Sequence, residues 1–235
     1  MPHLSQPFRD LTPAELAPYI QHTKIDAGTT RAEAIAHAEE CLTHGFAAAM
    51  VAGSWVSLTA QVLAGTNVEV ASALDFPTVG VMTSRGKAAE AAELVRRGAA
   101  QIDIGTQIGW LKSGDFDGFR DDIAGVVRAA GVPVKVMLEL PLLTKAERDA
   151  AVDLSVEAGA SYLKNASSGQ VEVANPDSIA YLVGRAPDSV RVKASGGIKS
   201  SKQVVALLEA GAACVGTSAG LAIVTASEAA TATSY

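Results

Sequence analysis

The sequence predicts a single (β/α)8 barrel, an α/β fold of the TIM-barrel class, on three observations. Short β-rich runs alternate with alanine-rich amphipathic segments along nearly all of the 235 residues. The alternation continues through eight units of roughly 25 residues, as a barrel of this kind requires. Fragments such as LTHGF and EAGAS recur where a helix ends in glycine and feeds the next strand. We therefore expect one domain over residues 1–235.

Capping signals and apolar runs place the individual elements. The expected strands are 19–25, 46–51, 68–75, 101–105, 133–140, 160–166, 190–196 and 213–217. The expected helices are 30–44, 54–64, 83–98, 115–130, 144–158, 175–185 and 200–211. Thr30 and Thr144 each stand three residues before a glutamate, which indicates a capping box at a helix start. An open doubly wound sheet is the alternative, but no G-x-G-x-x-G follows the first strand.

The two ends of the chain depart from this repeat. Residues 1–18 are polar and broken by proline, so we expect an N-terminal extension with a short helix. Residues 225–235 are small and polar, and we expect a mobile tail.

Composition narrows the function classes. A net charge of −6 and a pI near 5.2 argue against a nucleic-acid or anionic-membrane partner, which needs a basic face. No run of 18 apolar residues and no signal-peptide pattern is seen, so we expect no membrane segment. Cys41 and Cys214 lie far apart, which makes a disulfide framework improbable. We expect a reduced, cytoplasmic protein.

Charged residues occupy strand positions that should face the barrel interior. Strand side chains alternate between the helix-covered outside and the inside. Apolar Ile102 and Ile104 suit the outside, which turns Asp103 inward, and the same alternation applies to the other strands. The inward set is Asp103, Lys135, Glu139, Lys164 and Lys193. A structural ion-pair network is one interpretation, and a catalytic centre at the carboxyl ends of the strands is the other.

Two of these lysines belong to neighbouring strands. Lys164 and Lys193 would lie about 4.8 Å apart across the ladder and share one volume. Two like charges at that range disfavour double protonation, so one amine should be neutral near pH 7. A neutral amine is the nucleophile that Schiff-base chemistry needs. The spacing does not decide which lysine it is.

Several motifs resemble one enzyme family. The segments IDIGTQIGWLKSGD, VKVMLELPLLT, YLKNASSG, VKASGGIKS and VGTSAG occur in the order found in the deoxyribose-phosphate aldolases, which are class I aldolases. The resemblance implies that Lys164 forms the Schiff base, that Lys193 lowers its pKa and that Asp103 is the general acid/base. The implied reaction is reversible cleavage of 2-deoxyribose 5-phosphate to glyceraldehyde 3-phosphate and acetaldehyde, with no cofactor.

Small-residue loops after the last strands suggest an anion site. SGG at 195–197 and GTS at 216–218 follow strands seven and eight, where this fold often cradles a phosphate with backbone N–H groups. The alternative is that these glycines only permit tight turns. The family uses these segments for phosphate, which implies a role for Gly169, Gly196, Gly197, Gly216 and Ser218. Further candidate substrate contacts are Gln21, Thr23, Lys135 and Asp75.

The sequence departs from the family pattern around the expected pocket. The altered positions are Gln21, Met50, Asp75, Leu140, Asn165 and Ala219. A carboxylate such as Asp75 would repel a phosphorylated substrate or bind a hydroxylated or cationic one. A second hypothesis is therefore a Schiff-base aldolase or lyase for another aldehyde or sugar. A third is a catalytically silent barrel that binds sugar phosphates.

The remaining candidates concern histidines, the last residue and assembly. The histidines and cysteines form no convincing ligand cluster in the sequence, so no metal is expected. His37 and His44 are expected on a surface helix, and His22 is given a structural role. Tyr235 is a candidate proton carrier on the tail, with a disordered end as the alternative. The resemblance implies a homodimer or a higher homo-oligomer.

Overall fold

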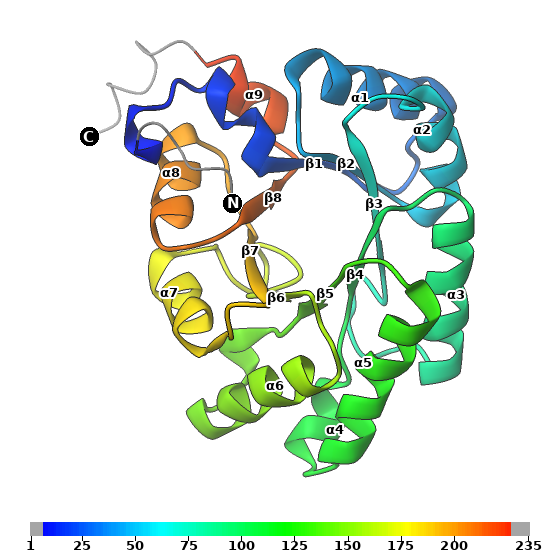
Figure 1. The fold of residues 1–235 in the computed structure, drawn as a ribbon, viewed down its shortest axis with the longest axis vertical. Coiled ribbons are helices and arrows are strands. Elements are labelled where there is room, and N and C mark those ends of the chain that lie inside the picture. The colour runs from blue at the N-terminus through cyan, green and yellow to red at the C-terminus, as the bar shows by residue number, and fades with distance from the viewer. Residues whose placement is uncertain (1–6, 227–235) are drawn as a thin grey trace.

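The strands close into a barrel, as the sequence predicts. The computed structural model describes residues 7–226. Within that range eight parallel strands each pair with the next along the chain, and the last pairs with the first (Figure 1). They are β1 (Ile20–Lys24), β2 (Ala48–Val51), β3 (Glu69–Leu74), β4 (Gln101–Ile104), β5 (Val134–Met137), β6 (Tyr162–Lys164), β7 (Arg191–Ser195) and β8 (Cys214–Thr217). The prediction of a (β/α)8 barrel is confirmed.

Helices surround the barrel on the outside (Figure 1). They are α1 (Arg31–His44), α2 (Val56–Val62), α3 (Ser84–Arg96), α4 (Ile108–Lys112), α5 (Phe116–Ala130), α6 (Lys145–Glu157), α7 (Pro176–Arg185), α8 (Ser201–Glu209) and α9 (Gly220–Val224). The two short helices α4 and α9 were not expected, because each is a five-residue segment without a side-chain cap. The seven expected helices are all present, within a few residues of their expected bounds.

The helix ends follow the capping signals of the sequence. Thr30 accepts a hydrogen bond from the Glu33 N–H while the Glu33 carboxylate accepts from Thr30, which completes a capping box on α1. Thr144 and Glu147 repeat this arrangement on α6. Gly45 ends α1 with φ 69° in the left-handed region, where a side chain would be strained. These local signals explain why helix existence could be predicted.

The N-terminal segment consists of short 3₁₀ helices. The first, η1, spans Phe8–Asp10 and packs against α8, whereas the second, η2, spans Ala14–Tyr19 and packs against α9. Further 3₁₀ turns are η3 (Gly53–Trp55) and η4 (Leu140–Leu142). The expected extension at 1–18 therefore holds helical turns from residue 8 onward. Most of the expected tail at 225–235, including Tyr235, lies outside the described residues.

The main core lies between the barrel and the helices, and the interior of the barrel is of a different kind. Outward strand residues such as Ile102, Ile104 and Val136 are fully buried in the outer core. The inner cluster is small, with Ala48, Met50 and Ala71 at its centre. Small side chains there leave room for the long lysine side chains that share the interior. No helix within residues 7–226 combines the length and the apolar character that crossing a membrane requires.

Strand β5 is shorter than predicted, and this moves one candidate. The expected strand 133–140 ends at Met137, and Glu139 follows it with φ 50° in the left-handed region. Pairing to the next segment continues irregularly, because the N–H groups of Leu138 and Leu140 bond the carbonyls of Lys164 and Asn165. Glu139 thus lies past the strand end and does not follow the alternation that the sequence suggested.

Candidate active site

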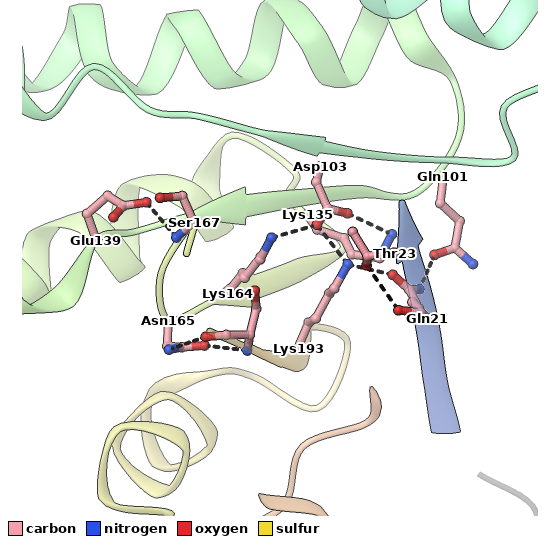
Figure 2. Close-up of polar contacts among 11 residues, drawn as sticks. Gln21, Thr23, Gln101, Asp103, Lys135, Glu139, Lys164, Asn165, Ser167 and Lys193 are labelled. Carbon is pink, nitrogen blue, oxygen red and sulfur yellow. Dashed lines mark hydrogen bonds and ion pairs between the residues drawn. The ribbon is translucent and has the colours of Figure 1, made fainter. Parts of the chain in front are cut away.

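Asp103 lies at the centre of the polar cluster inside the barrel. Its Oδ2 accepts hydrogen bonds from Lys164 Nζ at 3.0 Å and from Lys193 Nζ at 2.8 Å. Lys135 Nζ lies 3.3 Å from the other oxygen, Oδ1. Figure 2 shows the three lysines converging on this carboxylate from β5, β6 and β7. The strand register explains the convergence, since Asp103 is opposite Lys135 and Lys164 is opposite Lys193.

Burial and charge act against each other at this cluster. Burial alone would raise the pKa of Asp103, but the charges of Lys193, Lys164 and Lys135 hold it well below its usual range. Asp103 is therefore a carboxylate. Burial lowers the pKa of Lys135 to about 8, against the opposing attraction of Asp103. One anion thus faces three amines, and the cluster cannot hold three ammonium charges without cost.

Lys164 differs from Lys193 in its hydrogen-bond partners. Burial lowers the pKa of Lys164, Asp103 opposes this shift, and the nearby charge of Lys193 adds to it. Lys193 Nζ donates both to Asp103 and to Gln21 Oε1, the latter at 2.5 Å. Within the described residues, Asp103 is the one hydrogen-bond acceptor recorded for Lys164 Nζ. The arrangement therefore favours Lys164 as the neutral amine.

A cavity of about 510 Å³ opens above these lysines at the carboxyl end of the barrel. Lys164, Lys193 and Asp103 form its polar floor. The loops after β6, β7 and β8 form one wall, and their small and hydroxylated residues line it. The candidates from the sequence that line the cavity are Thr23, Gly169, Gly196, Gly197, Gly216 and Ser218. Met50 and Ala219, two of the positions that depart from the family, line it as well.

Sequence reasoning missed several polar residues of this wall, among them Lys199 and Ser167. Lys199 follows the SGG segment by two residues, and a cation next to a glycine-rich loop was a usable signal. Ser167 belongs to the loop after Lys164, and its N–H donates to Glu139 Oε1 at 2.7 Å. Glu139 therefore contacts the loop that follows Lys164, and we assign it the role of holding that loop in position (Figure 2).

The glycine loops are packed too tightly to accept side chains. Gly196 has φ 114°, and a Cβ there would lie 2.2 Å from the Glu172 carbonyl oxygen. A Cβ on Gly169 would lie 2.8 Å from the Gly197 nitrogen. Asn165 fastens the same two loops, because its side chain both donates to the Ser195 carbonyl and accepts from the Ser195 N–H. The glycines thus permit tight turns, and Gly169, Gly196 and Gly197 also line the cavity.

Gln21 and Lys135 do not line the cavity. Both are buried in the barrel interior, where Gln21 contacts Lys193 and Gln101, and Lys135 contacts Asp103. Their expected role as substrate contacts is replaced by a role in holding the charges of the cluster.

Asp75 is turned away from the cavity, contrary to expectation. Its fully buried side chain lies 3.0 Å from Lys87 Nζ and accepts the N–H groups of Gly80, Val81 and Met82. Lys87 also donates to Asp122 at 2.7 Å. The structure therefore contradicts the idea that Asp75 selects the substrate by charge. The sequence did not show that its cationic partner, Lys87, lies on α3.

The histidines of β1 and α1 pack together. His37, expected on a surface helix as a solvated or packing residue, is buried, and its ring packs on that of His22 at a centroid distance of 4.6 Å. His22, His37 and Glu40 bring potential metal-ligand atoms within 4.8 Å of one another. The sequence did not indicate that these three side chains meet, because their contact depends on the packing of α1 on β1. Cys41 and Cys214 are both free and buried.

Comparison with known proteins agrees with the fold. No protein-family model matches the chain. The deoxyribose-phosphate aldolase of Methanothermobacter thermautotrophicus is 41% identical over 214 residues, which cover 91% of this chain and 95% of that protein. That of Brevibacillus brevis is 39% identical over 208 residues, covering 88% and 94%. The solved tetrameric deoxyribose phosphate aldolase from Aeropyrum pernix superposes with a TM-score of 0.82 at 27% identity, covering 91% of each chain.

Proposed function

Because the chain belongs to the deoxyribose-phosphate aldolases, a family of lyases, we propose that it reversibly cleaves 2-deoxy-D-ribose 5-phosphate to D-glyceraldehyde 3-phosphate and acetaldehyde through a Schiff base on Lys164. One observation carries the proposal: a buried lysine on the floor of a cavity shares a carboxylate oxygen with a second lysine. This geometry favours the neutral form of an amine that lies where a substrate aldehyde can reach it, which supports the proposal.

The proposed mechanism follows from the charges of the site. The neutral Lys164 amine attacks the substrate aldehyde carbon, and loss of water gives a cationic imine. The imine withdraws the electron pair of the breaking C–C bond, so that an enamine forms in place of a free carbanion. The substrate hydroxyl loses its proton as glyceraldehyde 3-phosphate leaves. Protonation of the enamine and hydrolysis of the imine then release acetaldehyde.

Asp103 and Lys193 carry the proton transfers in this scheme. Asp103 is ionised and within hydrogen-bond reach of both amines, so it can take a proton and pass it on, directly or through water. Lys193 holds a positive charge beside Lys164 and thereby favours the neutral form of that amine. Acid–base groups of this kind typically contribute about 10²- to 10⁴-fold to the rate.

The substrate phosphate is proposed to bind at the loop wall of the cavity. The backbone at Gly169, Gly196 and Gly197 lines this wall, and its N–H groups are the proposed donors to the anion. Ser218 adds a hydroxyl and Lys199 a positive charge at the same wall. With Asp75 paired elsewhere, no carboxylate of the β3 loop opposes a phosphorylated substrate there.

A second candidate is the same chemistry on another aldehyde. It is favoured by Ala219, which lines the wall where the family commonly has a serine hydroxyl, and by the apolar lining contributed by Ile25, Met50 and Phe76. A barrel that binds sugar phosphates without turnover is a third.

A substrate panel joined to chemical trapping tests these proposals. Deoxyribose 5-phosphate and unphosphorylated deoxyribose are each assayed for cleavage, and acetaldehyde plus borohydride is followed by mass mapping of the modified residue. Cleavage of the phosphorylated sugar with label on Lys164 supports the proposal. Faster cleavage of deoxyribose supports the second candidate, and absence of both turnover and label supports the third. Label on another lysine, with Lys164→Met active, overturns the assignment.

Assembly and location belong to the same proposal. We place the enzyme in the cytoplasm as a homodimer or higher homo-oligomer, since its cysteines are free and one structural neighbour is tetrameric. Sedimentation of the purified chain measures the oligomeric state.

A further inference from the structure

A cluster of three potential ligands lies outside the barrel, between β1 and α1, and takes no part in the proposed aldolase chemistry. His22 belongs to β1, whereas His37 and Glu40 stand three residues apart on α1 and so share one face of that helix. One ligand atom from each residue lies within 4.8 Å of the other two. His22 Nε2 is 3.4 Å from Glu40 Oε2.

The two imidazole rings are fixed in position. A Cβ added to Gly220 would lie 2.6 Å from His22 Nδ1, so α9 closes that edge of the ring and Nε2 is the nitrogen that faces Glu40. Both histidines are at least 95% buried, with exposures of 5% and 2%.

A solvent-accessible cavity of about 310 Å³ leads to this cluster. His22, His37 and Glu40 line it together with three further charged residues, Lys24, Asp26 and Glu33. The carboxylates outnumber the single lysine, so the charge around the cavity suits a cation. The cavity also has room for water to fill a ligand position that the protein leaves open.

We propose that His22, His37 and Glu40 bind a divalent transition-metal ion of the zinc type. Two neutral imidazoles and one carboxylate are ligands that zinc takes, and three protein ligands leave one position for water. Zinc ligands at about 2.0–2.1 Å in a tetrahedron lie about 3.3 Å apart, close to the distance between His22 and Glu40 in the empty cluster. Rotation of the partly exposed Glu40 side chain can bring its oxygen to the ion.

The site is separate from the lysine cluster but adjoins it. Thr23 and Ser218 line both this cavity and the candidate active site. The ion would lie on the helix side of β1, and the amines lie on the inner side. Its binding can thus be measured without any measurement of aldolase turnover, and the two proposals fail independently.

The test is a metal titration of the untagged full-length protein after treatment with a chelator and desalting. CoCl₂ is followed by its visible absorption, and ZnCl₂ is then added as a competitor and titrated separately by calorimetry. We expect one ion per chain, with cobalt displaced by zinc. Glu40→Gln keeps the size of the side chain, and it should weaken zinc binding at least tenfold, as loss of a ligand does. His37→Asn should have the same effect.

Glu39→Gln is the matched control, because Glu39 is an exposed neighbour on α1 that does not line the cavity. Its zinc affinity should equal that of the parent chain. The proposal is overturned if neither ion binds, or if Glu40→Gln and Glu39→Gln bind zinc as the parent chain does. Circular dichroism establishes that each variant is folded, and Glu40→Gln alone decides if His37→Asn does not fold.

Discussion

Lys164 and Lys193 stand directly opposite each other on β6 and β7, and both amines donate to the same oxygen of Asp103. A single carboxylate oxygen therefore serves two potential cations in a buried site. The charges of Asp103 and Lys193 act on the pKa of Lys164 in opposite directions. Because of this coupling, the roles of Lys193 and Asp103 can be distinguished by the pH dependence of their variants as well as by the rates.

Replacing Lys193 with methionine should slow cleavage and shift its pH dependence. The charge of Lys193 lowers the pKa of Lys164, so its removal raises that pKa. The nucleophile must be neutral, which means that the acid limb of the kcat/KM profile moves to higher pH. At pH 7 we expect a loss of at least about 10²-fold, partly recovered in alkali. A pH–rate profile measures this.

The exposed Lys202 on α8 provides the control, since Lys202→Met removes an equal charge far from the barrel interior. An acid limb that stays in place in Lys193→Met would show that Lys193 does not set the protonation of Lys164.

Asp103→Asn should separate imine formation from bond cleavage. The charge of Asp103 raises the pKa of Lys164, so the asparagine variant holds a neutral amine down to lower pH. Borohydride trapping of acetaldehyde should persist at lower pH than in the parent chain, while cleavage falls by about 10²- to 10⁴-fold. Mass spectrometry and a cleavage assay on one sample give both quantities. Unimpaired cleavage would remove Asp103 from the proton relay.

The barrel and its inner charges could be predicted because both depend on short-range periodicity. Alternation along β4, β5 and β7 is enough to turn Asp103, Lys135 and Lys193 inward, whatever the rest of the chain does. The parallel order of β6 and β7 then places Lys164 opposite Lys193. No distant information is needed for these steps.

The errors concern residues whose partners are distant along the chain. Asp75 looked free to meet the substrate, because nothing in its surroundings shows that Lys87 turns back to it from α3. The contact of His37 with His22 was not foreseen, because it depends on the packing of α1 on β1. Glu139 seemed part of a strand, because the left-handed turn at its own position leaves no signal in a non-glycine residue.

Gly216→Ala should lower kcat through Lys193. The glycine was assigned to the phosphate site, but an added Cβ would lie 2.9 Å from Lys193 Cε. We expect the lysine side chain to be displaced, with kcat reduced at least about tenfold because small misplacements of catalytic groups are costly. The KM for deoxyribose 5-phosphate should change less. Steady-state kinetics distinguish the two effects.

Gly125→Ala on α5 is the matched control, because nothing lies within 4 Å of an added Cβ there. Its kinetics should be unchanged. A raised KM with unchanged kcat in Gly216→Ala would instead assign this glycine to the phosphate site.

Lys87→Met should destabilise the barrel at pH 7. Lys87 is fully buried between Asp75 and Asp122, and its removal leaves two buried carboxylates without their cation. Loss of one partner of a buried pair typically costs about 3–5 kcal/mol. Urea unfolding at pH 7 measures the free energy of unfolding. Lys145→Met breaks the exposed pair with Asp149 and should change it by less than about 1 kcal/mol.

The same variant should respond to pH with the opposite sign to the parent chain. Burial raises the pKa of Asp75, but Lys87 and the N–H groups of Gly80 and Val81 bring it below its usual value. In the parent chain this carboxylate stabilises the fold above its unfolded pKa of about 3.9, and the contribution is lost as the pH falls through the folded pKa. Without Lys87, burial dominates and the folded pKa rises above the unfolded one. Protonation of Asp75 at lower pH then stabilises the variant. The difference in free energy of unfolding between the parent chain and Lys87→Met should therefore be smaller at pH 5 than at pH 7. An equal or larger deficit at pH 5 would show that the lysine contributes through packing and not through its charge.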